Sequence, residues 1–199
     1  MKLVVGLIGG IGSGKSRVAE AFVRRGARVV SGDEAGHEAL RQPEVIAWAE
    51  QRWGRSVLDE HGNVLRPKVA GIVFQNPEEL KALESVVFPL IRARLEEQLD
   101  AGASDPGVRL LVLDAAVLLE AGWNELCDRI VYVHAPRDVR LQRLARQRGW
   151  TEKEVAARQG AQLPLAEKAS RADDAVDNSG PPEQTDQQVD ALWRRWNLS

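Results

Sequence analysis

The sequence predicts an α/β protein built on a parallel β-sheet, and three observations carry this prediction. Strand and helix signals alternate along the chain. The runs 108–114 and 129–134 are almost continuously apolar, which is typical of strands that are buried on both faces of a parallel sheet. A further apolar run, 3–8, leads directly into the glycine-rich segment 9–16.

The glycine-rich segment reads GGIGSGKS and matches the phosphate-binding pattern G-x-x-x-x-G-K-[ST] at every fixed position. Backbone N–H groups of such a loop converge on phosphate oxygens, and the N-terminus of the following helix adds positive potential. The pattern places Lys15 at the β- and γ-phosphates and the Ser16 hydroxyl on Mg²⁺. A turn that merely joins strand to helix is the alternative. Because the fixed positions and the flanking periodicity agree, we expect the chain to bind a nucleoside triphosphate.

The segment after the loop predicts a helix and then a strand. The helix covers 17–25 and is closed by Gly26, and the short strand 28–31 brings Asp33 to its C-terminal end. Asp33 also fits as the N-cap of a helix that starts near Glu34, and the two roles are compatible.

The middle of the chain is predicted to be mainly helical. Residues 43–53 form a helix that begins at a proline and ends before a glycine, and 59–63 reads as a turn. An N-cap, a first-turn proline and two carboxylates at 76–79 begin a second helical stretch, which runs towards Ala101. Pro89 is expected to break this stretch into two pieces, before a loop at 102–107.

The C-terminal part resumes the alternation after the apolar strands. Residues 137–148 predict a very basic helix, and Thr151 with Glu154 forms a capping box that opens another. A minimal strand at 175–176 and a turn at 177–182 precede a final helix. The apolar residues of that helix are Val189, Leu192, Trp193 and Trp196.

Composition limits the classes of function. The 199 residues are 44% hydrophobic, enough for one core with a satellite lobe. The formal net charge of −2 gives no reason to expect a nucleic acid or a membrane surface as partner. Cys127 is the only cysteine, which excludes an intrachain disulfide and a cysteine-based zinc site. Without a signal-peptide pattern or an apolar run approaching about 18 residues, the sequence predicts a cytoplasmic protein.

A phosphate loop does not by itself separate a switch, a motor and a kinase. The guanine-reading motif Asn-Lys-x-Asp is absent, which weakens a GTPase interpretation. Asp33 ends a predicted strand, where open α/β sheets bind ligands, and a carboxylate there can accept a hydroxyl proton. Asp114 ends another predicted strand and is expected near Mg²⁺, although a simple strand end is the alternative.

The basic helix offers a third observation. Its guanidiniums recur at helical spacing, and such a helix can close as a lid over polyphosphate and neutralise charge during transfer. A solvated helix face is the alternative interpretation. The arginines are Arg137, Arg140, Arg143, Arg146 and Arg148. The three histidines have no metal-ligand spacing and are assigned surface or structural roles.

Taken together, these features resemble one family, the dephospho-coenzyme A kinases, over nearly the whole chain. The 114–120 and 172–180 blocks are more particular to it than the phosphate loop, which many folds share. The full set of matching positions is 9–16, 29–33, 53–54, 62–66, 73–74, 83–84, 88–89, 113–122, Gln162, Lys168, 172–173 and 176–180. The resemblance implies a P-loop kinase fold with a five-stranded parallel sheet flanked by helices, a helical acceptor-binding lobe and a lid.

The resemblance also implies an organisation and a reaction. It implies a single domain over 1–199, with a core at about 1–34, 105–136 and 172–199, an acceptor-binding lobe at about 35–104 and a lid at about 137–171. The implied reaction transfers the γ-phosphate of ATP, with Mg²⁺, to the ribose 3′-hydroxyl of dephospho-CoA, giving CoA and ADP in the final step of CoA biosynthesis. The implied partner is this small molecule, and monomer and weak homo-oligomer both stay open.

Site residues follow from the same resemblance. The implied catalytic residues are Asp33 as the base, Lys15, Arg140 and Arg143, and which arginine meets the γ-phosphate stays open. The residues implied to hold ATP are Gly10, Ile11, Gly12, Ser13, Gly14, Lys15, Ser16, Arg17 and Asn178. Those implied to hold dephospho-CoA are Asp33, Arg66, Pro89, Arg92, Leu118, Leu119, Glu120 and Gln162. Mg²⁺ is implied on Ser16 directly and on Asp114 through water.

Two other classes stay open at this point. One is another P-loop kinase, acting on a nucleotide or a different small molecule. The other is a non-catalytic nucleotide-binding interaction protein, because the sequence departs from the family pattern at Arg17 and Phe88. In the lid, Arg140 and Gln147 stand where the family usually has glutamine and arginine.

Overall fold

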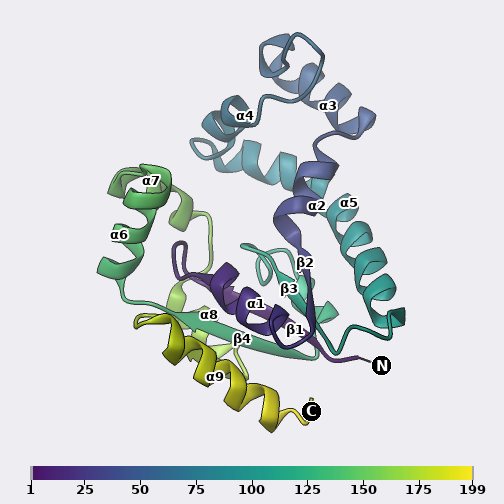
Figure 1. Ribbon diagram of the computed structural model, residues 1–199. Helices are drawn as coiled ribbons and strands as arrows, with labels where there is room; N and C mark the ends of the chain where they lie inside the picture. Colours follow the sequence, from purple (N-terminus) through teal and green to yellow (C-terminus); the bar gives the residue numbers. More distant parts are fainter. Residues whose placement is uncertain (1, 199) are drawn as a thin grey trace. The chain divides into compact units, whose positions relative to one another are not determined.

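The protein is described here by a computed structural model that covers residues 2–198 and divides into two compact units. Asp33–Leu95 is one, called the helical unit, and the remaining described residues form the sheet unit. Figure 1 traces the elements of both. Within residues 2–198, no helix combines the length and the apolarity needed to cross a membrane.

The sheet unit is built on five parallel strands in the order β2-β3-β1-β4-β5. In the central part of the sheet, Asp114 of β3 pairs with Leu7 of β1 on one side and with Ser31 of β2 on the other. The strands are β1 Val4–Gly9, β2 Ala27–Ser31, β3 Leu110–Asp114, β4 Arg129–His134 and β5 Asp174–Asp177. The predicted five-stranded parallel α/β fold is therefore confirmed.

Helices flank this sheet and make up most of the helical unit. Those of the sheet unit are α1 Lys15–Val23, η2 Trp123–Leu126, α6 Arg137–Arg148, α7 Glu152–Gly160, α8 Leu165–Ser170 and α9 Pro182–Arg195. Those of the helical unit are α3 Pro43–Trp53, η1 Arg55–Val57 and α4 Arg66–Val73, while α2 Gly32–Ala39 and α5 Pro77–Ser104 each span the boundary between units. Since α2 begins at Gly32, Asp33 lies in its first turn rather than at an N-cap position before it.

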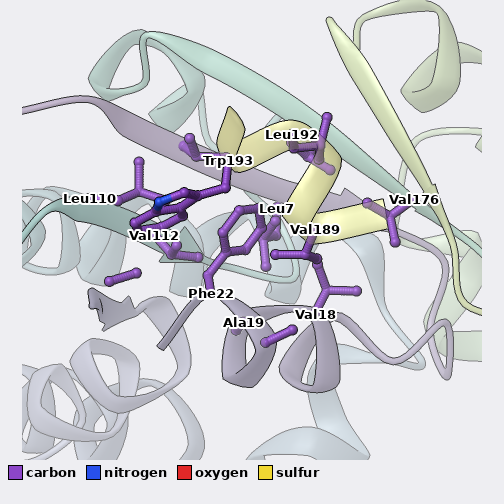
Figure 2. Close-up of a cluster of buried hydrophobic side chains, with 14 of the residues drawn as sticks. Leu7, Val18, Ala19, Phe22, Leu110, Val112, Val176, Val189, Leu192 and Trp193 are labelled. Carbon is purple, nitrogen blue, oxygen red and sulfur yellow. The ribbon is translucent and has the colours of Figure 1, made fainter. Parts of the chain in front are cut away.

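One face of the sheet is covered by α1 and α9 (Figure 1). Figure 2 shows Phe22 of α1 and Trp193 of α9 packed among strand side chains that include Leu7 and Val112. The apolar positions of α9 recur at the helical spacing, so one stripe of that helix faces the sheet. Trp196 extends the cluster, and its ring stacks on that of Phe22 with centroids 5.8 Å apart.

Pro89 does not break α5, and the expectation of two helices is wrong. The helix is continuous over 28 residues with the proline inside it. Proline removes one backbone donor and crowds the preceding turn. Val87, Ile91 and Leu95 lie four residues apart and are all buried, so packing along this stripe outweighs the local cost.

The C-terminal end of α5 also runs past its expected end. Residues 102–104, predicted as part of a loop, are helical. Gly102 makes this possible, because a Cβ there would collide with the Leu111 side chain of β3. The helix can therefore approach the sheet closely at this point.

The helical unit has a core of its own. The buried members of this core are Ala49, Val57, Leu58, Val69 and Val73. Trp48 and Trp53 pack against them from α3, edge to face with ring centroids 5.0 Å apart. An antiparallel bridge between Leu58 and Val64 closes the turn that leads into α4. The unit therefore holds its shape through internal packing.

Candidate active site

The phosphate loop leaves the carboxyl end of β1 and turns sharply into α1. The Ser13 N–H donates to the Gly10 carbonyl at 2.9 Å. Gly12 and Gly14 have φ of 79° and 85°, in the left-handed region that side chains avoid, and Gly14 is the residue before the helix. The Lys15 and Ser16 N–H groups at the start of α1 have no acceptor among the described residues, whereas the Arg17 N–H donates to the Gly14 carbonyl at 3.1 Å, so the first two are open to a ligand.

Two side chains at the start of α1 are uncommitted. Neither the Lys15 ammonium nor the Ser16 hydroxyl hydrogen-bonds or ion-pairs with any residue in 2–198. Ser13 lies deeper, and its Oγ is buried without a hydrogen-bond partner among the described residues. An ammonium and a hydroxyl free at a helix N-terminus are suited to phosphate oxygens and their counter-ion.

Asn178 supports the loop from behind. It lies just after β5 and is buried, and its Nδ2 donates to the Ser13 carbonyl at 2.8 Å and to the Gly14 carbonyl at 3.4 Å. Its Oδ1 accepts a hydrogen bond from the Thr185 hydroxyl of α9 at 3.0 Å. Both ends of the amide are thus engaged by protein. The side chain of this predicted ATP residue shapes the loop and leaves ligand contact to the backbone.

Helix α6 packs onto the same loop through two of its arginines. Arg140 is buried, and its Nη1 donates to the Ile11 carbonyl at 3.2 Å. Arg143 donates to the Ser13 carbonyl at 3.3 Å and to the Asn178 carbonyl at 2.7 Å. Burial lowers the pKa of the Arg140 guanidinium, which still carries its charge because arginine pKa values start so high. Its Nε is buried without an acceptor among the described residues.

The arginines of the basic helix fall into two groups. Arg137, Arg146 and Arg148 are exposed, as expected of a solvated face. Arg140 and Arg143 contact the phosphate loop, and the lid function stays a prediction. The approach is close, since a Cβ on Gly12 would lie 2.9 Å from the Arg140 carbonyl oxygen.

A buried ion pair joins the segment after β3 to the end of the predicted lid. Glu120 Oε1 lies 2.8 Å from the Lys168 Nζ and accepts the Leu163 N–H at 2.8 Å. Lys168 is 1% exposed, and its Nζ also donates to Gln162 Oε1 at 3.3 Å and to the Ala116 carbonyl at 3.4 Å. Glu120 and Gln162, both predicted to hold the acceptor, therefore also hold the protein together here.

The other predicted acceptor residues are distributed over both units. Leu118 and Leu119 have buried side chains in the sheet unit, which leaves mainly their backbone for a ligand. In the helical unit, Asp33 lies two residues after the carboxyl end of β2, and Arg66 opens α4. Pro89 and Arg92 lie within α5.

The two residues predicted to hold Mg²⁺ are Ser16 and Asp114, and they follow or end two neighbouring strands. Ser16 follows β1 through the phosphate loop, and Asp114 is the last residue of the adjacent β3. Both therefore belong to the carboxyl edge of the sheet, where open α/β folds bind their ligands.

Sequence reasoning missed the structural roles of two residues, Lys168 and Thr185. Lys168 matched the family pattern without an assigned role, and a single lysine in a six-residue helix gives no sign of burial. Thr185 lies in the first turns of α9 and looks like any helix-start hydroxyl. Only the tertiary contacts with Glu120 and Asn178 distinguish them.

Comparison with solved structures defines the class. The fold is shared with shikimate kinase from Acinetobacter baumannii, with a TM-score of 0.54 at 16% identity over 99% of this chain and 94% of that one. A crystal structure of TT1252 from Thermus thermophilus agrees more closely, with a TM-score of 0.82 at 32% identity over 98% and 97% of the two chains. With its phosphate loop and basic helix, the chain is a P-loop kinase.

The particular family follows from sequence. A family model described as dephospho-CoA kinase matches residues 3–184, and the chain belongs to the dephospho-CoA kinase family. A relative of that name from Geobacillus kaustophilus is 36% identical over 99% of this chain and 98% of its own length. Another, from Syntrophotalea carbinolica, is 40% identical over 97% of this chain and 92% of its own length.

Proposed function

We propose that this kinase transfers the γ-phosphoryl group of ATP to the ribose 3′-hydroxyl of dephospho-CoA, giving CoA and ADP. The main observation in support is the Lys15 ammonium at the start of α1, which has no hydrogen-bond or ion-pair partner among the described residues. The chain that carries it matches the family over residues 3–184. Relatives named dephospho-CoA kinase that align over nearly the whole chain support this choice of acceptor.

The donor site uses the loop and the basic helix. Backbone N–H groups over 10–17 bind the phosphates, and Arg17 is included through its backbone. Two of these groups also have acceptors within the loop, since the Ser13 N–H donates to the Gly10 carbonyl and the Arg17 N–H to the Gly14 carbonyl. Lys15 binds the β- and γ-phosphates. Arg140 and Arg143 neutralise charge that develops during transfer. The buried Arg140 Nε–H lacks an acceptor among the described residues, so a phosphate oxygen satisfies it best.

Mg²⁺ fits the donor set of this site. Among residues 2–198 there is no group of three or more His, Cys, Asp or Glu side chains arranged to hold a metal. Nucleotide-bound Mg²⁺ needs few protein ligands, because phosphates and water supply most of its octahedron. The Ser16 hydroxyl would hold it directly, and the Asp114 carboxylate would do so through water. When bound, the ion offsets the negative charge of the β- and γ-phosphates.

Asp33 is the base. The 3′-oxygen of the acceptor forms a bond to the γ-phosphorus while the bond from that phosphorus to the ADP oxygen breaks. The hydroxyl proton passes to the Asp33 carboxylate, late in a loose transition state. Positioning of the acceptor is assigned to Arg66, Pro89, Arg92, Leu118, Leu119, Glu120 and Gln162.

The setting of the reaction follows from its substrates. We assign the protein to the cytoplasm, with small-molecule partners only and with neither nucleic acid nor membrane among them. A net charge of −2 agrees with this assignment. Monomer and weak homo-oligomer are both compatible with a site whose assigned residues all belong to one chain.

ADP release with a panel of acceptors tests the proposal. Steady release with dephospho-CoA, and none above background with nucleoside monophosphates or shikimate, is the expected result. Asp33→Asn should lower kcat about 10²-fold or more with little change in ATP binding, and Lys15→Ala should abolish turnover. Asp100→Asn, the same change at an exposed position of α5, is the control.

Each contrary outcome has a definite meaning. Preference for another acceptor would make the protein a different small-molecule kinase. Tight ATP binding without turnover on any acceptor would indicate a nucleotide-binding interaction protein. Near-normal turnover by the Asp33 variant would remove the base assignment and leave the reaction standing.

A further inference from the structure

The helical unit contains a cavity that the donor site does not use. Its volume is about 390 Å³, and it opens between the end of α2 and the segment that leads into α4. All six lining residues belong to this one unit. They are His37, Leu40, Arg41, Asn63, Val64 and Arg66.

The cavity carries positive charge without a protein partner. Neither the Arg41 guanidinium nor the Arg66 guanidinium hydrogen-bonds or ion-pairs with any residue in 2–198. Two carboxylates near these residues in sequence are engaged elsewhere: Glu38 accepts from Arg94 at 2.7 Å, and Asp59 accepts the Asn63 N–H at 2.8 Å within the turn. Two guanidiniums that face one cavity without a carboxylate partner favour an anionic ligand.

The arrangement suits a diphosphate more than a single carboxylate. Each guanidinium presents a planar fork of donors that matches two oxygens of one phosphate. His37 adds a ring N–H at the same wall. Leu40 and Val64 complete the lining with apolar surface, so a ligand that continues from its phosphates into an uncharged arm fits better than a bare ion.

The cavity lies close to the proposed base, Asp33, along helix α2. His37 follows Asp33 by four residues on the same helix, so the two lie on one face about 6 Å apart along the axis. Arg41 lies two residues after the end of the helix and lines the same cavity as His37. In dephospho-CoA the acceptor hydroxyl is on C3′ and the diphosphate on C5′, separated only by the ribose ring.

We propose that this cavity binds the 5′-diphosphate of the acceptor and the first part of its pantetheine arm. Arg41 and Arg66 hold the two phosphates, and His37 donates to the phosphate nearer the ribose. The arm leaves along Leu40 and Val64. This inference rests on the proposed function, and it assigns Arg41 and His37 as specificity-determining residues that select a nucleoside diphosphate ester over a nucleoside.

Steady-state kinetics of single variants test the assignment. Arg41→Ala and Arg66→Ala should each raise the KM for dephospho-CoA about 10- to 100-fold, because each loses a charge-assisted contact. The KM for ATP and kcat should stay within about twofold. Arg41→Lys keeps the charge but loses the fork, so its KM should lie between those of the wild type and the alanine variant.

Arg55→Ala is the matched control, since Arg55 lies in the same unit and outside the cavity and pairs at the surface with Glu50 at 3.1 Å. It should leave every constant near wild type. An unchanged dephospho-CoA KM in the Arg41 and Arg66 variants, or an equal rise in the KM for ATP, would overturn the inference and leave the proposed function intact. Absence of turnover by the wild type on dephospho-CoA would instead overturn the proposed function itself.

Calorimetric titration supplies a second readout that does not depend on turnover. Dephospho-CoA should bind the wild type in the absence of ATP and bind Arg41→Ala at least about tenfold more weakly. Adenosine, which has the ribose but no diphosphate, should bind both proteins equally. Adenosine weakened to the same degree would show that Arg41 acts on the nucleoside and would also overturn the assignment.

Discussion

Lys168 is the residue whose environment departs most from what its type prefers. Lysine is almost never fully buried unless it is paired, and here the ammonium lies against the Glu120 carboxylate with two further oxygen acceptors. The Glu120 Oε2 has no hydrogen-bond partner among the described residues. Such a pair stabilises little relative to an apolar pair, but it is costly to break from one side.

Removal of one partner should therefore be more damaging than removal of both. Lys168→Met is expected to lower the free energy of unfolding by about 3–5 kcal/mol, because it leaves the Glu120 carboxylate buried and uncompensated. Combining it with Glu120→Gln should recover part of that loss. Urea denaturation of the single and double variants measures both.

Lys153→Met in α7 is the control, because Lys153 is exposed. Its free energy of unfolding should change by less than about 0.5 kcal/mol. A double variant that is less stable than Lys168→Met would contradict the account of an unpaired buried carboxylate.

At the scale of residues, the role of a residue could be predicted from the sequence only where a local sequence motif specifies it. Lys15 and Ser16 are fixed by the phosphate-loop spacing, and the structure places them at the start of α1. The support that Asn178 gives to the loop spans 165 positions in the chain. No local periodicity encodes a contact at such separation, so only the resemblance suggested that this turn matters.

At the scale of elements, long periodic segments were predicted well and short ones poorly. The strands β3 and β4 and the helices α3 and α6 lie where the apolar pattern and the end signals put them. Helix α8 has six residues and α4 eight, which is too short for a period to stand out. The break predicted at Pro89 was wrong because the rule that proline ends a helix considers only local structure, whereas tertiary packing keeps α5 continuous.

The contact between α1 and α9 predicts a dependence of stability on pH. Arg25 donates to Asp190 at 2.6 Å, and this hydrogen bond lowers the pKa of the Asp190 carboxyl in the folded protein. A lowered folded pKa means that the contribution is present above the ordinary carboxyl pKa, about 3.9, and is lost as the pH falls through the folded value. Asp190→Asn should therefore lose less stability than the wild type on acidification.

Thermal unfolding at neutral pH and at about pH 3 measures this difference. Arg25→Met should reduce the dependence at least as much, since it removes the pair with Asp190 and also the contact with Asp186 at 3.7 Å. The effect is modest, because the Asp190 side chain is half exposed and solvent screens the interaction. An Asp190 variant with the full acid sensitivity of the wild type would exclude this pair as a source.

At the scale of the whole molecule, the sequence predicted a core, a helical lobe and a lid, but not where packing divides the chain into two units. A lobe of about 35–104 was expected, and the helical unit is Asp33–Leu95. The last turns of α5 belong with the sheet because Gly102 lets them approach β3. No composition change marks that transition within a continuous helix, which is why the sequence does not reveal it.

This division predicts separate responses to the two substrates. A non-hydrolysable ATP analogue should slow amide hydrogen exchange in the phosphate loop and in α6, because both belong to the donor site. Dephospho-CoA alone should slow exchange in α2 and at the start of α4, around the cavity. Exchange measured by mass spectrometry with each ligand separately tests the division.

The buried core of α3 serves as an internal reference, since it contacts neither proposed ligand site and its exchange should stay constant. If the ATP analogue slowed exchange around the cavity as much as in the loop, a division of labour between the units would be excluded. Equal slowing everywhere would indicate global stabilisation by the ligand.

The hydrogen bonds from Asn178 to the loop carbonyls also bear on the order of synthesis. The loop leaves the ribosome before the amide that holds it, which follows 165 residues later. Until Asn178 has been synthesised, the loop exists without this support. A nascent chain therefore acquires a finished nucleotide site only after strand β5 has been made and has joined the sheet.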